Sequence, residues 1–242
     1  MKVAEKIDKR IDRFKEGATF TYQQLGLEPA EFGAAAKTME RLVKKGIVQR
    51  ASTGLFYKPQ KTVFGLLKPN EEELLKPYLF EGSSRVAYIT GSSLYNKLGL
   101  TTQISNRIKV ASRSKRIIAQ IGNLKISPIK SYLEVTNENY YLLEILDALK
   151  DFKKIPDRDQ QLMIKRLTVL VKQLLETDRK KLVKCALKYP PRVRALLGAL
   201  LENISEMDSN LETLKKSMNP LTIYSYGIKK ELLPTITNWN IQ

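Results

Sequence analysis

The sequence predicts an α+β fold: an N-terminal winged helix-turn-helix, then a small basic α/β unit, then a mostly helical C-terminal region. Three observations support this prediction. Helical patterns before residue 46 lead directly into two β-like runs, residues 82–133 combine β-like runs with a complete lack of Asp and Glu, and a helical period persists after residue 137. We therefore expect a first domain at residues 1–61 and a second at 62–242, with its α/β part at about 82–135 and its helical part at about 137–242.

The first helix is predicted over residues 2–15. Its apolar residues Val3, Ile7, Ile11 and Phe14 fall on one stripe, as they do in a helix that buries one face. A short extended piece follows at residues 18–20. The pair Thr21 and Gln24 has the spacing of a capping box, which predicts a short second helix from about Tyr22 to Gly26.

A longer helix and a β-hairpin follow. Pro29 suits the first turn of a helix, and Gly46 suits the position just after its end. The β-like runs are Ile47–Arg50 and Leu55–Tyr57. The order helix, short strand, short helix, longer helix and hairpin is the order of a winged helix, and its longer helix is the one that enters the major groove.

The outward face of this longer helix is basic and predicts contacts with DNA. Its alternative is an ordinary solvated helix face. Cations one turn apart can reach a duplex from one side, and a threonine hydroxyl can bond to a base edge or a phosphate. The residues predicted to contact the groove are Lys37, Thr38 and Arg41, and those predicted to contact phosphates are Lys44, Lys45, Arg50 and Lys58.

Residues 59–81 are interpreted as a linker and a lead-in, because they contain Pro59, Pro69 and Pro77. Asn70 is a suitable cap for a helix over residues 71–79.

The acid-free window from Gly82 to Leu133 would hold about five acids at the average of the chain, and it holds nine Lys and Arg residues. We expect a strand at 86–89, a short helix at 92–98 and strands at 107–111, 116–121 and 124–129, the last two joined by a Gly-Asn turn. The window predicts a second surface for nucleic acid or for an acidic protein, and a solvated basic sheet face is the alternative. The residues of this candidate surface are Arg85, Lys97, Arg107, Lys109, Arg113, Lys115 and Arg116.

The rest of the chain has a helical period, and Tyr189-Pro190-Pro191 forces a break within it. An apolar tail containing Leu232, Leu233, Ile236 and Trp239 is expected to pack back onto these helices. The predicted helices are 139–152, 157–175, 179–188, 192–204 and 207–217.

Composition excludes several classes of site. The chain has a formal net charge of +17, which favours an anionic partner, most often nucleic acid. It has no histidine and one cysteine, so neither a Cys/His zinc site nor a histidine general base can form. Cys185 lies at helical spacing from Leu182 and Tyr189 and is interpreted as a core residue. With no apolar run of transmembrane length and no apolar core near its N-terminus, the chain is expected to be cytoplasmic.

No enzyme is predicted. Gly91-Ser92 after a strand is similar to the start of a nucleotidyltransferase site, but that chemistry needs two carboxylates for magnesium, and no acid lies between Glu81 and Glu134. Glycine-rich nucleotide-binding loops are absent from the sequence, and no cofactor is expected.

Three stretches resemble the AbiEi-like antitoxin and transcriptional-regulator family of bacterial type IV toxin–antitoxin (abortive infection) systems, in a branch with an N-terminal winged helix. They are RLVKKGIVQRASTGLFY (Arg41–Tyr57), ITGSSLYNKLGLTTQIS (Ile89–Ser105) and LKYPPRVRALLGALLENI (Leu187–Ile204), the last being the most specific. In the first stretch, the predicted wing is one residue longer than the shortest form of the family.

The resemblance implies a DNA-binding antitoxin that represses its own operon, at inverted repeats, and neutralises a nucleotidyltransferase-like toxin. Three alternatives stay open from the residues. They are a stand-alone winged-helix transcriptional regulator, an antitoxin that binds only protein, and an RNA-binding accessory protein. The last is disfavoured because few aromatic residues occupy stacking positions.

Overall fold

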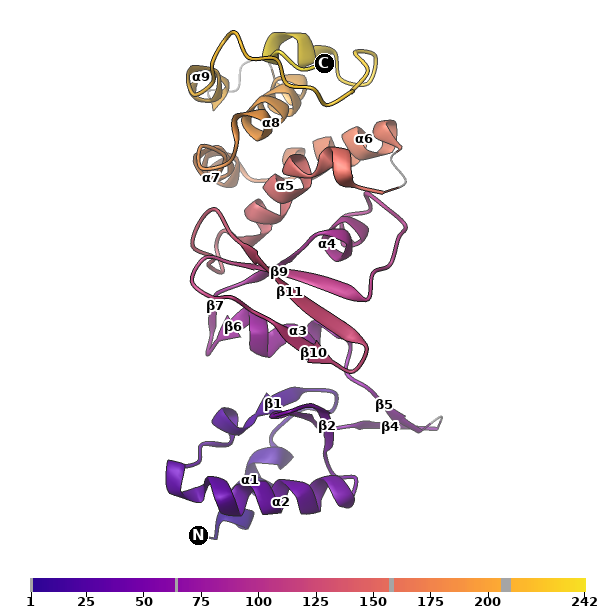
Figure 1. Ribbon diagram of the computed structural model, residues 1–242, viewed down its shortest axis with the longest axis vertical. Helices are drawn as coiled ribbons and strands as arrows, with labels where there is room; N and C mark the ends of the chain where they lie inside the picture. The colour runs from indigo at the N-terminus through magenta and orange to yellow at the C-terminus, as the bar shows by residue number, and fades with distance from the viewer. Residues whose placement is uncertain (1, 64, 157–158, 206–209) are drawn as a thin grey trace. The chain divides into compact units, whose positions relative to one another are not determined.

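The computed structural model describes residues 2–63, 65–156, 159–205 and 210–242, and within them the protein is a mixed α+β chain (Figure 1). The chain divides into two compact units. The first contains residues 1–83 and 119–125, and the second contains residues 84–118 and 126–242. The sequence places a boundary at residue 61, whereas by compactness the first unit continues to Ser83.

In the first unit, helix α1 packs against α2, and a three-stranded antiparallel sheet has the order β1-β3-β2 (Figure 1). Ile7, Phe20, Met39 and Phe56 are almost fully buried in its core. The elements are α1 (Val3–Asp12), β1 (Thr19–Thr21), η1 (Tyr22–Leu25), η2 (Pro29–Glu31), α2 (Phe32–Lys44), β2 (Gln49–Ser52) and β3 (Leu55–Tyr57).

Two predicted helix-end signals of this unit are present in the structure. The Thr21 amide donates to the Gln24 side chain over 2.9 Å, which is half of the predicted capping box. Gly46 has a φ of 70°, the left-handed conformation that ends a helix at low cost for glycine. The second predicted helix is a single 3₁₀ turn, and a further 3₁₀ turn at Pro29 precedes α2.

The described residues of the predicted linker, 59–63 and 65–81, form regular elements. They form an antiparallel hairpin of β4 (Gln60–Thr62) and β5 (Gly65–Leu67), then α3 (Glu71–Leu79). The predicted cap is confirmed, because the Asn70 side chain accepts a hydrogen bond from the Glu73 amide over 2.8 Å. Helix α3 packs against β1, where the Thr19 hydroxyl donates to the Glu73 carbonyl over 2.7 Å.

The α/β part of the chain is a four-stranded sheet with the order β10-β11-β9-β8. A two-stranded hairpin of β6 and β7 precedes it. The window is therefore built much as predicted, although the strand predicted at 116–121 begins only at Ala119. The elements are β6 (Phe80–Glu81), β7 (Ser84–Arg85), β8 (Tyr88–Thr90), α4 (Ser92–Lys97), β9 (Arg107–Ser112), β10 (Ala119–Ile121) and β11 (Leu124–Lys130).

The helical part surrounds α8, whose residues Ala195–Leu201 are all buried. The C-terminal tail packs onto α8 as predicted, with Leu233, Ile236 and Trp239 buried. The helices are α5 (Tyr140–Lys150), η3 (Phe152–Lys154), α6 (Gln160–Lys172), α7 (Glu176–Ala186), α8 (Pro191–Ile204), α9 (Asn210–Lys216) and η4 (Pro234–Trp239). The predicted starts at 157 and 207 lie outside the described residues.

Candidate nucleic-acid interface

The predicted reading face of α2 is solvent-exposed at its cations. Lys37, Arg41, Lys44 and Lys45 are all exposed, while Ala35, Met39 and Leu42 on the opposite side are buried. Packing of this apolar stripe against α1 therefore fixes the direction in which the basic stripe points. Lys44 is partly neutralised by Glu40, whose carboxylate lies 3.0 Å from the lysine ammonium group.

The other predicted contacts of this unit are held by local bonds. The Thr38 hydroxyl donates to the Ala34 carbonyl over 2.9 Å, so its proton is already used within the helix. The Arg50 guanidinium lies 5.5 Å from the centre of the Phe56 ring. The ammonium group of Lys58, just after β3, donates to the Asp12 carbonyl over 3.3 Å. The predicted DNA contacts whose side chains are exposed and not held by other groups of the protein are therefore Lys37, Arg41 and Lys45.

A second basic row runs along α1 to the residue just after it; the helical pattern places its members off the apolar stripe, but they were assigned no function from the sequence. Its members line a cavity of about 300 Å³ together with Leu25 and Gly26. The Arg10 side chain donates to the Gln24 carbonyl over 3.1 Å, and the Lys6 ammonium group bonds to Glu31 over 2.6 Å, which lowers the pKa of that carboxyl. The signal was present in the sequence, because the row follows the helical spacing that also places the apolar stripe. The row is Lys6, Lys9, Arg10 and Arg13.

In the second unit, three of the seven predicted residues of the basic window come together. Arg113, Lys115 and Arg116 line a cavity of about 460 Å³, and Lys130 joins them from β11. The cavity is in the size range of ligand sites in proteins. Its other lining residues are Ser112, Ser114, Pro128 and Ile129. We call this site the basic cavity.

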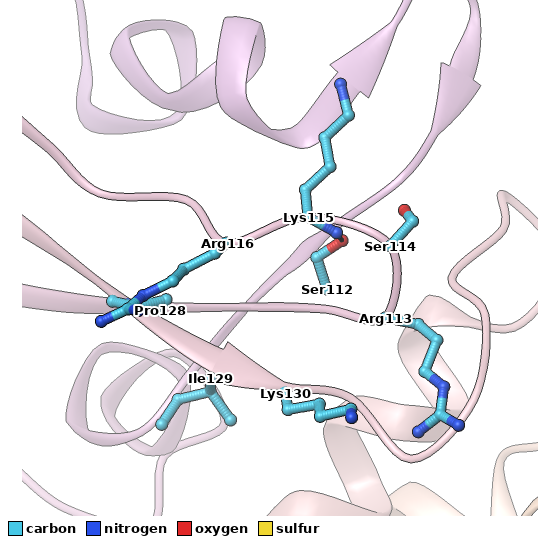
Figure 2. A pocket seen from close by; sticks show the side chains of 8 residues that line it. All are labelled: Ser112, Arg113, Ser114, Lys115, Arg116, Pro128, Ile129 and Lys130. Carbon is cyan, nitrogen blue, oxygen red and sulfur yellow. Dashed lines mark hydrogen bonds between the residues drawn. The ribbon is translucent and has the colours of Figure 1, made fainter.

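The loop that carries these cations is anchored at Ser112. The Ser112 hydroxyl donates to the Val86 carbonyl over 2.7 Å and accepts from the Lys115 amide over 3.3 Å. The Ser112 carbonyl in turn accepts from the Ser131 amide over 3.0 Å. Figure 2 shows the loop passing beside Pro128–Lys130 of β11, with the three cationic side chains of the loop leaving it in different directions.

The other predicted residues of the window do not line this cavity. Arg85 is half-buried, with its guanidinium 3.8 Å from the centre of the Tyr140 ring, so part of its charge stabilises the packing of the unit. Lys97 is in the last turn of α4, and Arg107 and Lys109 are exposed on β9.

Comparison with known proteins places the chain in a family. The model of DUF6088, described as a family of unknown function, matches residues 6–178, which is more than half of the chain. The chain belongs to the DUF6088 family. The matched range includes α2, the basic cavity and α5, but not α8 or the C-terminal tail.

One solved structure has a fold similar to that of this chain. The crystal structure of the RV2827C protein from Mycobacterium tuberculosis is similar to this chain with a TM-score of 0.52 and 11% sequence identity, over 92% of this chain and 84% of that chain. At this identity the likeness concerns the fold alone. None of the curated proteins compared with the chain matches it.

A buried acid within the DUF6088 match was also missed by the sequence reasoning. Asp147 of α5 is 1% exposed. One of its oxygens accepts from the Tyr88 hydroxyl over 3.0 Å and the Thr90 hydroxyl over 2.7 Å. The other accepts from the Lys150 ammonium group over 2.6 Å and the Tyr189 hydroxyl over 3.3 Å. Asp147 follows Leu143 by one helical turn, so an acid on the apolar stripe of the helix was the sequence signal that could have indicated a buried carboxylate.

This network stabilises the fold and does not form an open site. Burial, and next the charge of Asp147, raises the pKa of both Tyr88 and Tyr189, so both hydroxyls stay protonated donors. Although no acid is near Gly91-Ser92 in the sequence, the fold brings Asp147 into contact with the adjacent Thr90. Its four donors occupy the carboxylate and solvent does not reach it, which leaves no lone pair directed at a ligand.

Two further findings concern other classes of site. Cys185 is 8% exposed, and burial raises the pKa of its thiol, as expected for a core residue. Every helix in the described part of the chain is too short or too polar to span a lipid bilayer.

Proposed function

We propose that the protein is a cytoplasmic, DNA-binding transcriptional regulator whose first unit is a winged helix-turn-helix. The observation that supports this most is the exposed basic row of α2, which leads into an antiparallel hairpin after the four residues Lys45–Val48. In a winged helix, the helix enters the major groove and the hairpin lies against the adjacent backbone. Lys37 and Arg41 are assigned to the groove, and Lys45 to a phosphate.

The charge of the chain favours this function over a neutral scaffold. With a net charge of +17, long-range attraction would speed association with DNA and make the affinity strongly dependent on salt. The basic row of α1 extends the positive surface of the same unit, because Lys9, Arg10 and Arg13 are also exposed. Inverted repeats in the operator are expected if two copies bind together.

The Arg41→Ala variant tests the assignment of α2. Arg41 is exposed and makes no ion pair in the described part of the chain, so its removal should leave folding unchanged. We expect the affinity for the promoter of the protein's own operon to fall by about 1–3 kcal/mol, with a smaller salt slope if a phosphate contact is lost. Fluorescence anisotropy with a labelled promoter duplex, at two salt concentrations, measures both quantities.

The matched control is Lys172→Ala, which removes one exposed cation at the end of α6 in the second unit. It should retain the affinity of the wild type. If Arg41→Ala binds the promoter like the wild type at both salt concentrations, or if both variants lose the same affinity, α2 is not the reading helix.

A second candidate function is neutralisation of a toxin, which the resemblance to the AbiEi-like family suggests. A specific observation favours a protein partner. The β4–β5 hairpin exposes Val63, Leu66 and Leu67, which are 93%, 44% and 50% exposed. Adjacent exposed apolar side chains are typical of protein contact sites. The family-like stretch in α8 does not provide such a surface, since Val193 and Ala195–Leu201 are buried.

Co-expression with the product of the adjacent reading frame tests this candidate. We expect that product to be toxic alone and that the wild-type protein restores growth. Leu66→Ser with Leu67→Ser should abolish the rescue, because it removes the apolar contact, whereas Arg41→Ala should still rescue. A neighbour that is not toxic, or a toxic neighbour that the wild type does not neutralise, would reject the antitoxin function and leave a stand-alone regulator.

A further inference from the structure

We propose that the basic cavity of the second unit binds the sugar–phosphate backbone of a nucleic acid. The proposal rests on the proposed function only for the choice of nucleic acid as the polyanion. It concerns a different site from α2. The residues that would hold phosphates are Arg113, Arg116 and Lys130, with Lys115 beside them.

Three of the cations that line the cavity are available to a ligand. Arg113, Arg116 and Lys130 are exposed, and none of them makes an ion pair with an acid in the described part of the chain. No acid is found among the eight lining residues, nor anywhere in residues 82–133. Cations gathered without counter-charges repel one another, and a polyanion would relieve that repulsion.

The arrangement of the cations favours an extended ligand over a single compact anion. The side chains of the loop leave it in different directions, so one phosphate cannot reach all of them (Figure 2). A strand with regularly spaced phosphates can contact them one after another. Pro128 and Ile129, both half-buried, add an apolar surface on which a sugar or base edge can lie.

The cavity is also held in shape before a ligand arrives. The Ser112 bonds to Val86 and Lys115 fix the start of the loop, and the Arg113 guanidinium lies 3.4 Å from the Ser131 carbonyl. A preformed site loses less conformational entropy on binding. Because the lining has no carboxylate, binding requires no divalent cation and should be insensitive to a chelator.

The test uses the full chain and a fluorescent 24-base-pair duplex of mixed sequence unrelated to the promoter. The variant Arg113→Gln/Arg116→Gln/Lys130→Gln removes the cavity charges. We expect a fall in affinity of about tenfold or more at low salt, and a salt slope smaller by about 2–3, because each lost phosphate contact lowers it by about 0.9. The far-ultraviolet circular dichroism spectrum verifies folding.

The matched control is Lys153→Gln/Lys172→Gln/Lys188→Gln, which removes the same charge from exposed positions of the second unit outside the cavity. It should change the affinity by less than about twofold and leave the slope as it is, since it removes long-range attraction but no phosphate contact. Equal losses in the two triple variants would reduce the effect to net charge and overturn the proposal. Wild-type affinity in the cavity variant would overturn it as well.

Two further arms separate this site from others. In the Arg41→Ala background, the cavity substitutions should lower the affinity for the duplex by the same factor as in the wild type. If Arg41→Ala alone leaves the affinity unchanged, that result rejects only the assignment of α2. Adenosine triphosphate without metal should compete with the duplex no better than its charge predicts. Competition at micromolar concentrations, lost in the cavity variant, would identify a free-nucleotide site instead and overturn the backbone proposal.

Discussion

Asp147→Ala is expected to destabilise the protein by about 3–5 kcal/mol, because it leaves a half-buried cation and buried hydroxyl donors without their acceptor. The carboxylate accepts from Tyr88, Thr90, Tyr189 and Lys150, and the Lys150 side chain is only 15% exposed. Urea unfolding, followed by circular dichroism with linear extrapolation, measures the change in the free energy of unfolding.

Asp147→Asn separates charge from shape at the same position. It keeps the size of the side chain but removes the partner of Lys150, so we expect a smaller loss of about 1.5–3 kcal/mol. Glu134→Ala is the control, because this acid is exposed and its removal should change stability by no more than about 0.5 kcal/mol. An Asp147→Ala variant within about 1 kcal/mol of the wild type would show that the network does not stabilise the fold.

Gly198→Ala is expected to destabilise the protein by about 3 kcal/mol through overpacking of α8. A Cβ atom at this position would lie 2.2 Å from the Cη2 and Cζ3 atoms of Trp239, far inside contact distance. The indole is 1% exposed and its Nε1 donates to Glu202, so the ring cannot move away freely. The clash outweighs the gain of about 1 kcal/mol that alanine gives over glycine in a helix.

The fluorescence of Trp239 in the C-terminal tail can detect the effect of Gly198→Ala. Trp239 is the only tryptophan, so displacement of the C-terminal tail should shift its fluorescence emission to longer wavelength. Adding Trp239→Leu to Gly198→Ala should cost less than the sum of the two single changes, because the larger ring is what the new methyl group meets. Additive effects would contradict a direct clash.

Gly33→Ala is the matched control at an exposed helical position. Gly33 lies in α2, and nothing lies within 4 Å of a Cβ atom built there. Alanine should therefore stabilise the protein by about 0.5–1 kcal/mol through helix propensity and the unfolded state. The two glycines differ in their neighbours and not in their helical conformation, and only the structure distinguishes them.

The sequence by itself determined the elements whose signals are local. A capping pair at Thr21, a glycine at Gly46, a cap at Asn70 and a proline at Pro191 each act on residues a few positions away in sequence, so the helix ends they predict appear in the structure. It also determined the charge of the chain and the absence of histidine, which exclude whole classes of site. The exposed cations of α2 followed from helical period alone.

Tertiary structure decided which distant residues meet. The β4–β5 hairpin is stabilised by pairing between its two strands, and the sequences of these short strands do not predict that pairing. Lys130 joins Arg113 and Arg116 only because β11 pairs beside β9, and Asp147 meets residues 42 to 59 positions away. Gly198 and Trp239 meet only because the tail folds back. Such contacts depend on how faces pack, whereas the pattern along a chain reveals only which face each element buries.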